Sequence, residues 1–405
     1  MTLTPTGRKR VGTGIEGVSG GSLKGRLEPL DALRGVAAFA VSLGHLTILL
    51  SGAGAVIFAI GDKTPLAAFW RGNSAVLFFF MLSGFVLAIP FFKRPVSPTS
   101  FIVKRILRIY PAYWAACLLA FWVALQGTLL AADTPRLDWR LGTNYLFLFG
   151  AFNVNIADPV IWSLVHEIRV SVLFPFLMLA VKRFPSKWLL LGAAPIAFAG
   201  LLVVQPDGLT STASLAGTVW YSYLFLLGAC LARHRLWLAE WVARLPRAVI
   251  VIGLLGCLAM YGMPVMSDAY PVWRTALNFS LIAGGASGIM LIALARPLTG
   301  AVLRARPLLF MGRISYGYYL IHVPLLLLFI HYGSARVPNV VIAAAVIATT
   351  IGIAWLLNIW VEKPAIELGR RLADKLDRRL LPQPPMGQKA SVVQTQASAS
   401  DRSNP

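Results

Sequence analysis

The chain has 405 residues, of which 57% are hydrophobic and only 13% are charged. Soluble domains carry about 25% charged residues, so this composition excludes an ordinary soluble protein and indicates an integral membrane protein. The formal net charge is +21. In a membrane protein, an excess of Lys and Arg is typical of cytoplasmic loops, so we expect no nucleic-acid partner.

Ten apolar segments separated by polar loops follow one another along the chain. A transmembrane helix needs about 20 predominantly apolar residues. The segments cover residues 30–50, 73–92, 107–130, 161–181, 187–205, 217–232, 247–263, 274–295, 314–332 and 338–361. They predict an all-α fold, a polytopic membrane helix bundle of about ten transmembrane helices. A shorter apolar stretch at residues 145–152 cannot span a bilayer and is expected to be interfacial or re-entrant.

The basic residues are distributed unevenly over the loops. Most of the 37 Lys and Arg residues fall in residues 1–29 and in every second loop after them. Because basic loops stay in the cytoplasm, both termini are predicted to be cytoplasmic. We therefore expect three regions: a basic flexible arm (1–29), a transmembrane domain (30–366), and a cytoplasmic amphipathic end with a disordered tail (367–405).

The first apolar segment, LDALRGVAAFAVSLGHLTILL, carries Asp31, Arg34 and His45. A charged group inside a span costs about 3 kcal/mol or more near the bilayer centre, which makes it a functional candidate. Arg34 and His45 are eleven residues apart, so they lie within about 20° of one helix face and about 16 Å apart along it. The alternative is an Arg that reaches the lipid headgroups and a His that hydrogen-bonds to a neighbouring helix. We favour a functional pair.

The third and fourth apolar segments also carry charges. Lys104, Arg105 and Arg108 precede or open the third, and Arg105 and Arg108 share a helix face. Two guanidiniums on one face suit a polyphosphate, although an ordinary cytoplasmic basic cluster looks the same. Glu167 lies inside the fourth segment and needs a partner there, which we expect on another span, with His45 or Arg34 as candidates.

Two further segments contain polar side chains that can support a site. Ser83 lies in the middle of the second segment, where a small residue also lets another backbone approach closely. In the ninth segment, polar and aromatic side chains recur on one helix face and can line a cavity. These are Ser315, Tyr316, Tyr319 and His322. They fit equally well as interfacial tyrosines and one hydrogen-bonded histidine.

Taken together, these segments resemble the bacterial acyltransferase-3 family of membrane O-acyltransferases. The resemblance covers about residues 27–366 and rests on several stretches in order. They are LDALRGVAAFAVSLGH, FFFMLSGF, KRILRIYPAYW, IWSLVHEIRVSVLFP, MGRISYGYYLIHVP and VEKP. The chain departs from the family's pattern in the fourth segment, where Ile-Arg-Val-Ser follows Glu167 and His166 precedes it.

The resemblance implies transfer of an acyl group, acetyl above all, from cytoplasmic acyl-coenzyme A to a hydroxyl. The acceptor it implies is a cell-envelope glycan or glycolipid, and the location is the bacterial cytoplasmic membrane. We expect His45 to serve as the general base, with Glu167 orienting it or stabilising its imidazolium. A covalent acyl-His intermediate is the alternative to direct transfer. Arg34, Arg105, Arg108 and Lys104 face the phosphates of the donor. Acyl-coenzyme A is a substrate here, and neither a permanently bound cofactor nor a metal is expected.

Two alternatives remain open at this point. A proton-coupled transporter or glycan flippase also places ionisable residues inside ten spans. A carrier, however, is expected to show broken helices in paired halves near mid-depth. The second alternative keeps the reaction but changes the acceptor to a small molecule such as a macrolide. The oligomeric state does not follow from the sequence.

Overall fold

The computed structural model describes residues 23–49, 59–93, 95–128, 146, 160–205, 215–264, 271–295, 297–333 and 336–380. Within these ranges all regular elements are helices. The expected re-entrant stretch at 145–152 lies outside the described residues apart from Leu146. Most of the expected arm (1–22) and the tail from residue 381 also lie outside them.

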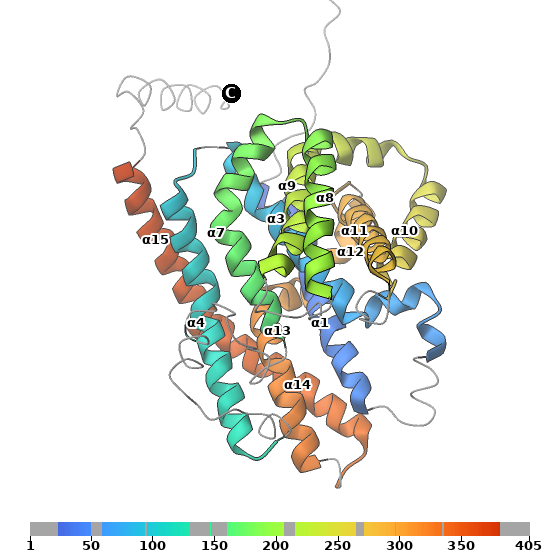
Figure 1. The fold of residues 1–405 in the computed structure, drawn as a ribbon. Coiled ribbons are helices and arrows are strands. Elements are labelled where there is room, and N and C mark those ends of the chain that lie inside the picture. The colour runs from blue at the N-terminus through green and yellow to red at the C-terminus, as the bar shows by residue number, and fades with distance from the viewer. Residues whose placement is uncertain are drawn as a thin grey trace, which may run out of the picture.

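The long helices pack side by side into one bundle (Figure 1). In chain order they are α1 (Leu23–Leu46), α3 (Gly72–Lys93), α4 (Pro98–Leu125), α7 (Trp162–Arg183), α8 (Ser186–Val204), α9 (Leu215–Arg244), α10 (Arg247–Tyr261), α11 (Val272–Ala295), α12 (Pro297–Leu303), α13 (Arg306–Gly333), α14 (Asn339–Leu357) and α15 (Lys363–Leu380). Two 3₁₀ turns, η1 (Thr47–Leu49) and η2 (Pro65–Phe69), follow α1 and precede α3. A π-helical turn, η5 (Asn358–Glu362), joins α14 to α15.

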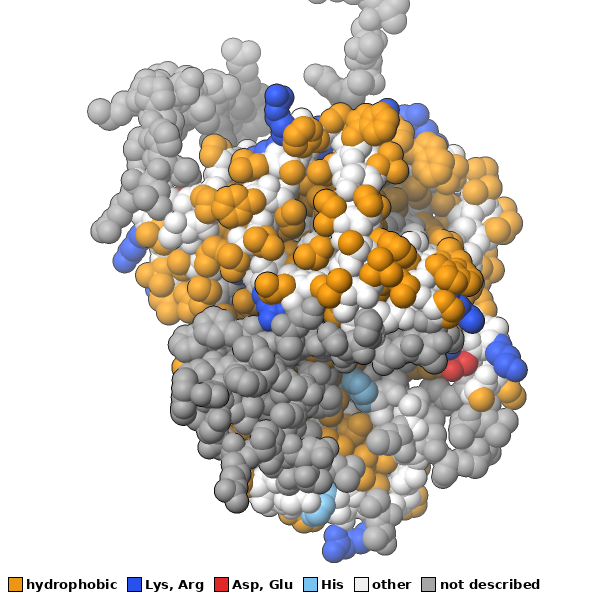
Figure 2. All heavy atoms as spheres, viewed as in Figure 1, with side chains coloured by type: hydrophobic (Ala, Val, Ile, Leu, Met, Phe, Trp, Pro, Cys, Tyr) orange, Lys and Arg blue, Asp and Glu red, His pale blue; other side chains and the backbone are white. Residues whose placement is uncertain are grey.

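Each of the ten predicted segments corresponds to a helix in the structure. Eight of the described helices are long and apolar enough to cross a membrane. The other two are α10, which has only 15 residues, and α1, which carries Asp31, Arg34 and His45. In Figure 2, apolar side chains cover most of the upper part of the view, with Lys and Arg side chains at the edges of that area. The predicted polytopic helical membrane bundle is therefore confirmed.

Several helix ends differ from the prediction because charged residues continue the helices rather than ending them. Helix α1 begins at Leu23, so the last seven residues of the expected flexible arm are helical. Helix α4 begins at Pro98 instead of 107, and α9 runs on to Arg244 instead of 232. Lys and Arg are good helix formers, so hydropathy alone places these boundaries too far inside the span. Helix α15 packs against the early part of α4.

Glycines fix the two closest helix pairs. Where α1 meets α13, a Cβ on Gly35 would lie 2.5 Å from the backbone nitrogen of Gly312. A Cβ on Gly312 would in turn clash with the backbone of Asp31. Gly84 and Gly228 play the same part between α3 and α9. Small residues let membrane helices approach this closely, and the contact leaves little freedom for one helix to slide along the other.

Candidate active site

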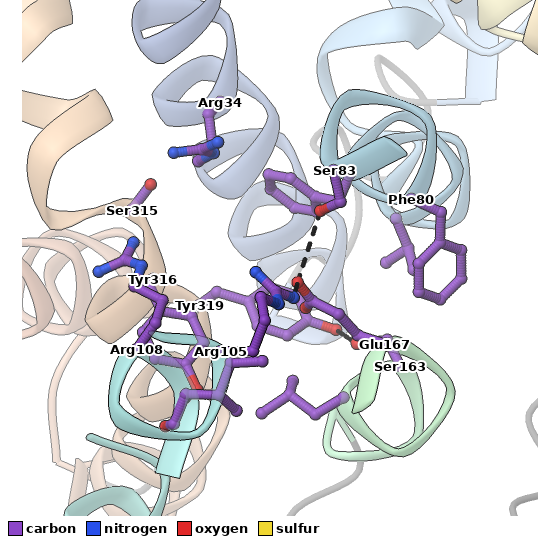
Figure 3. A pocket seen from close by; sticks show the side chains of 14 residues that line it. Arg34, Phe80, Ser83, Arg105, Arg108, Ser163, Glu167, Ser315, Tyr316 and Tyr319 are labelled. Carbon is purple, nitrogen blue, oxygen red and sulfur yellow. Dashed lines mark hydrogen bonds and ion pairs between the residues drawn. The ribbon is translucent and has the colours of Figure 1, made fainter. Parts of the chain in front are cut away.

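A polar cavity of about 110 Å³ lies inside the bundle. Figure 3 shows side chains from α1, α3, α4, α7 and α13 converging on it. Its polar lining consists of Arg34, Ser83, Arg105, Arg108, Ser163, Glu167, Ser315, Tyr316 and Tyr319. The structure thus brings together most of the residues singled out in the sequence. Of those residues, Asp31, Lys104, His45 and His322 do not line the cavity.

Glu167 is paired with Arg105 in this cavity. Arg105 Nη2 donates to Glu167 Oε1 over 2.6 Å, and Arg105 Nε donates to Ser171 Oγ over 3.0 Å. Ser83 Oγ reaches the same carboxylate oxygen at 3.4 Å. The expectation that Glu167 finds its partner on another span is confirmed. The named candidates, His45 and Arg34, were wrong, because the guanidinium of Arg105 occupies that position (Figure 3).

Arg108 is held by a carboxylate that sequence reasoning missed. Its Nη1 donates to Glu362 Oε2 over 2.8 Å, and the Glu362 side chain is fully buried. The Arg108 guanidinium also lies 5.3 Å from the ring centre of Tyr316, whose hydroxyl donates to the Ile109 carbonyl. In the sequence, Glu362 belongs to the VEKP stretch at the end of the last apolar segment, which contributes to the family resemblance but names no partner for the acid.

The cations differ in how far they are neutralised. The ion pair described for Arg34 is a 3.5 Å contact with Asp31, whose side chain is 53% exposed. An ion pair of that length and exposure contributes little. Lys104 lies 3.6 Å from Asp374 of α15 and does not reach the cavity. Arg105 and Arg108 face carboxylates at 2.6 and 2.8 Å. Arg34 is therefore the cavity cation with the weakest described countercharge.

His45 forms a hydrogen-bonded pair with His322. Nδ1 of His45 lies 2.9 Å from Nε2 of His322, and Nδ1 of His322 lies 2.7 Å from the carbonyl oxygen of Tyr319. A carbonyl only accepts, so Nδ1 of a neutral His322 carries the proton and its Nε2 is an acceptor. His45 must then donate from Nδ1. Its Nε2 then carries a lone pair, to which no donor is found among the described residues, and His45 is exposed while His322 is buried.

The contact between Gly35 and Gly312 fixes the relative heights of the two histidines. His45 lies ten residues after Gly35, and His322 lies ten residues after Gly312. Helices α1 and α13 run side by side, so the close contact at the glycines sets the histidines at equal height. Equal numbers of residues rise by equal distances along two helices.

Tyr319 stands between the cavity and the histidine pair. Tyr319 lines the cavity, and its hydroxyl donates to the Val160 carbonyl over 3.0 Å and lies 2.9 Å from Ser163 Oγ. Its backbone carbonyl accepts from His322. The ring packs edge-on against Phe79 at 5.8 Å. His45 is thus a second polar feature, about 16 Å along α1 from Arg34.

His166 of α7 has a structural role, in the contact between α7 and α9. His166 is buried, and its Nδ1 lies 2.9 Å from Thr218 Oγ1, which also accepts from Arg169 at 3.2 Å. This pairing ties α7 to α9. Within the described ranges, no three His, Cys, Asp or Glu side chains gather in a way that could hold a metal ion.

The fold and the cavity define a multi-pass helical membrane protein with a cationic internal site and an oriented histidine. Residues 28–359 match the family model described as an acyltransferase domain, that of the acyltransferase-3 family. The chain belongs to this family and is an acyltransferase, so the transporter alternative is set aside. Comparisons with curated proteins and with solved structures found no match.

Proposed function

We propose that this protein moves an acyl group, acetyl in the first instance, from acyl-coenzyme A to a hydroxyl group of a cell-envelope glycan or glycolipid. The donor enters from the cytoplasm, the enzyme sits in a bacterial cytoplasmic membrane, and His45 is the general base. The observation that carries this proposal is the 2.9 Å contact between His45 Nδ1 and His322 Nε2, which leaves Nε2 of His45 as the nitrogen that can take a proton.

The arrangement of His45 has the logic of a catalytic triad. In a triad, a partner on one ring nitrogen fixes the tautomer and the orientation, so that the other nitrogen is free to take a proton. Here His322 is that partner, and the Tyr319 carbonyl orients His322 in turn. The role first expected for Glu167 therefore passes to His322. Glu167 instead holds Arg105 in the cavity wall.

The proposed reaction balances without an added group. His45 Nε2 removes the proton from the acceptor hydroxyl while the hydroxyl oxygen attacks the thioester carbonyl carbon. The new C–O bond forms, the C–S bond breaks, and the coenzyme A thiolate leaves. The imidazolium of His45 then returns its proton to the thiolate, which restores the neutral base. Proton removal of this kind contributes about 10²–10⁴-fold to the rate.

The donor phosphates are proposed to contact Arg34 and Arg108. Arg34 has the weakest countercharge in the cavity, and the side chain of Arg108 remains 30% exposed beside its bond to Glu362. A guanidinium has five N–H donors, so Arg108 can bind Glu362 and a phosphate together. Arg105 is only 12% exposed and is engaged through Nε and Nη2, which makes it a weaker candidate.

The proposal is tested with membranes that contain the protein, incubated with radiolabelled acetyl-coenzyme A. We expect label to appear on lipid-linked or polymeric glycan. The variant His45→Ala should lose at least 100-fold of this transfer, in line with the contribution of a general base. His234→Ala is the control, since that ring lies on an exposed site beside Ser186.

Two results would contradict the proposal. If folded His45→Ala transfers the acyl group at near wild-type rate, His45 is not the general base. If label is found only on small soluble molecules, the acceptor is a small molecule and not a glycan. Folding of each variant is checked by monodispersity in gel filtration.

A further inference from the structure

The π-helical turn η5 carries two polar side chains that reach α13. Asn358 and Glu362 stand at the first and last positions of this turn, and both are buried. Asn358 Nδ2 donates to the Arg313 carbonyl over 3.0 Å, and Glu362 Oε1 accepts from the Gly317 amide over 3.1 Å. Arg313 and Gly317 are four residues apart, so the Gly317 amide and the Arg313 carbonyl are the donor and acceptor of one backbone hydrogen bond of α13. Two side chains of η5 therefore bind both groups of this hydrogen bond.

Gly317 makes this contact possible. A Cβ at this position would lie 3.0 Å from Glu362 Oε1 and 3.5 Å from the Ala354 carbonyl. The missing side chain lets the carboxylate lie against the backbone of α13. π-Helical turns occur frequently at functional sites, because the extra residue redirects side chains that a regular helix would point elsewhere.

The same carboxylate reaches the cavity through Arg108. Glu362 Oε2 accepts from Arg108 Nη1 at 2.8 Å and from Asn358 at 3.4 Å. Glu362 does not line the cavity, whereas Arg108 and Tyr316 do. Glu362 lies behind the residues that line the cavity. Its carboxylate accepts a charge-assisted hydrogen bond from Arg108 of α4 and another hydrogen bond from a backbone amide of α13. Charge-assisted hydrogen bonds are about twice as strong as neutral ones.

We propose that Glu362 is a positioning residue that sets the guanidinium of Arg108 for an anionic donor. This inference rests on the proposed function, since it takes the donor phosphates to contact Arg108. A binding group is effective when its own rotamer is fixed by the residues behind it. Without the carboxylate, Arg108 keeps its charge but loses its fixed orientation over Tyr316. The donor then binds less tightly, while the chemistry at His45 is unchanged.

The test measures coenzyme A binding by titration calorimetry on the purified full chain in nanodiscs. Glu362→Gln keeps the side-chain shape and an acceptor for Gly317, but removes the charge that holds Arg108. We expect about a tenfold loss of affinity. Glu367→Gln is the matched control, because Glu367 lies on α15 with exposed Arg370 and Arg371 as partners. That variant should bind coenzyme A as the wild type does.

A double-mutant cycle separates positioning from a merely structural role. If Glu362 acts through Arg108, adding Glu362→Gln to Arg108→Gln lowers the affinity less than twofold further. Additive losses in the double variant would overturn the inference. So would a Glu362→Gln protein that binds coenzyme A as tightly as the wild type or more tightly.

Two further outcomes keep the test decisive. If Glu362→Gln does not yield monodisperse protein, Asn358→Ala replaces it, since it removes one bond to Glu362 and retains the carboxylate. A loss of about threefold is then expected, and unchanged affinity would overturn the inference. If the wild type itself does not bind coenzyme A, the proposed donor is wrong, and the inference about Glu362 is wrong with it. Binding by the wild type with no effect of Glu362 overturns the inference alone.

Discussion

Gly35 of α1 lies against the backbone of Gly312 of α13, so closely that a Cβ on Gly35 would fall 2.5 Å from the Gly312 nitrogen. This contact sets the register that brings His45 to 2.9 Å from His322. Helix packing far from the reacting atoms therefore determines the geometry of the proposed base.

Replacing Gly312 by Ala should separate α1 from α13 and disrupt the histidine pair. The new Cβ would meet the backbone of Asp31, which cannot move aside as a flexible side chain can. A misplacement of about 1 Å can cost 100-fold in rate, and we expect acyl transfer to fall by about that factor. Initial rates with radiolabelled acetyl-coenzyme A measure this.

The control for Gly312→Ala is Gly192→Ala on α8, where a Cβ would meet nothing within 4 Å. That variant should keep wild-type activity. Equal rates for the two alanine variants would show that the glycine contact does not control the site.

Loss of His322 should lower the rate without weakening donor binding. In His322→Ala, Nδ1 of His45 has lost its acceptor, so the ring is free to turn and to change tautomer. We expect kcat to fall about 10- to 100-fold, which is at most the low end of the 10²–10⁴ that a general base supplies. His322→Gln should recover part of the loss, because its amide oxygen can accept from His45.

The measurement for His322 is the separation of kcat from KM for acetyl-coenzyme A. A rise in KM at unchanged kcat would assign His322 to donor binding and contradict the orienting role. Equal rates for His322→Ala and His322→Gln would argue against the hydrogen bond as the cause.

Much of this architecture was predictable because hydrophobicity and charge report burial locally. The ten apolar segments and the need of Glu167 for a partner on another span followed from residue type and spacing. The partner itself did not. Pairing Glu167 with Arg105 rather than His45 depends on how α4 and α7 are placed, which spacing along one helix does not contain.

The same limit explains the two other surprises. The pairing of His45 with His322 depends on the register between α1 and α13, and many glycines in the chain could have set another register. Glu362 was not among the predicted site residues, because the VEKP stretch carries only the family resemblance and spacing does not show which residue its carboxylate contacts. Only the π-helical turn and the close approach of Gly317 bury it.

The Arg105–Glu167 pair should stabilise the bundle. The two side chains are 12% and 23% exposed, so removing one partner leaves a charge in a largely buried position. We expect Glu167→Gln to lower the free energy of unfolding by about 3 kcal/mol, the low end for buried pairs. The double variant Arg105→Gln/Glu167→Gln should lose less than the sum of the single variants, since no lone charge remains.

Denaturation of the detergent-solubilised protein, followed by tryptophan fluorescence, measures these changes. The comparison is Glu367→Gln, which breaks an exposed pair on α15 and should not shift the transition. Additive losses in the double variant would show that the two residues contribute independently.

Arg34 should act on the donor and not on the chemical step. It lies about 16 Å along α1 from His45, so its contribution is uniform binding of the donor in the ground and transition states. Arg34→Lys keeps the charge but loses the bidentate geometry, and we expect KM for acetyl-coenzyme A to rise about tenfold at unchanged kcat. Arg34→Gln should raise it further. Arg336→Lys, on an exposed residue that bonds only locally among the described contacts, is the control. A fall in kcat at unchanged KM would place Arg34 at the reacting atoms instead and would contradict its proposed contact with the donor phosphates.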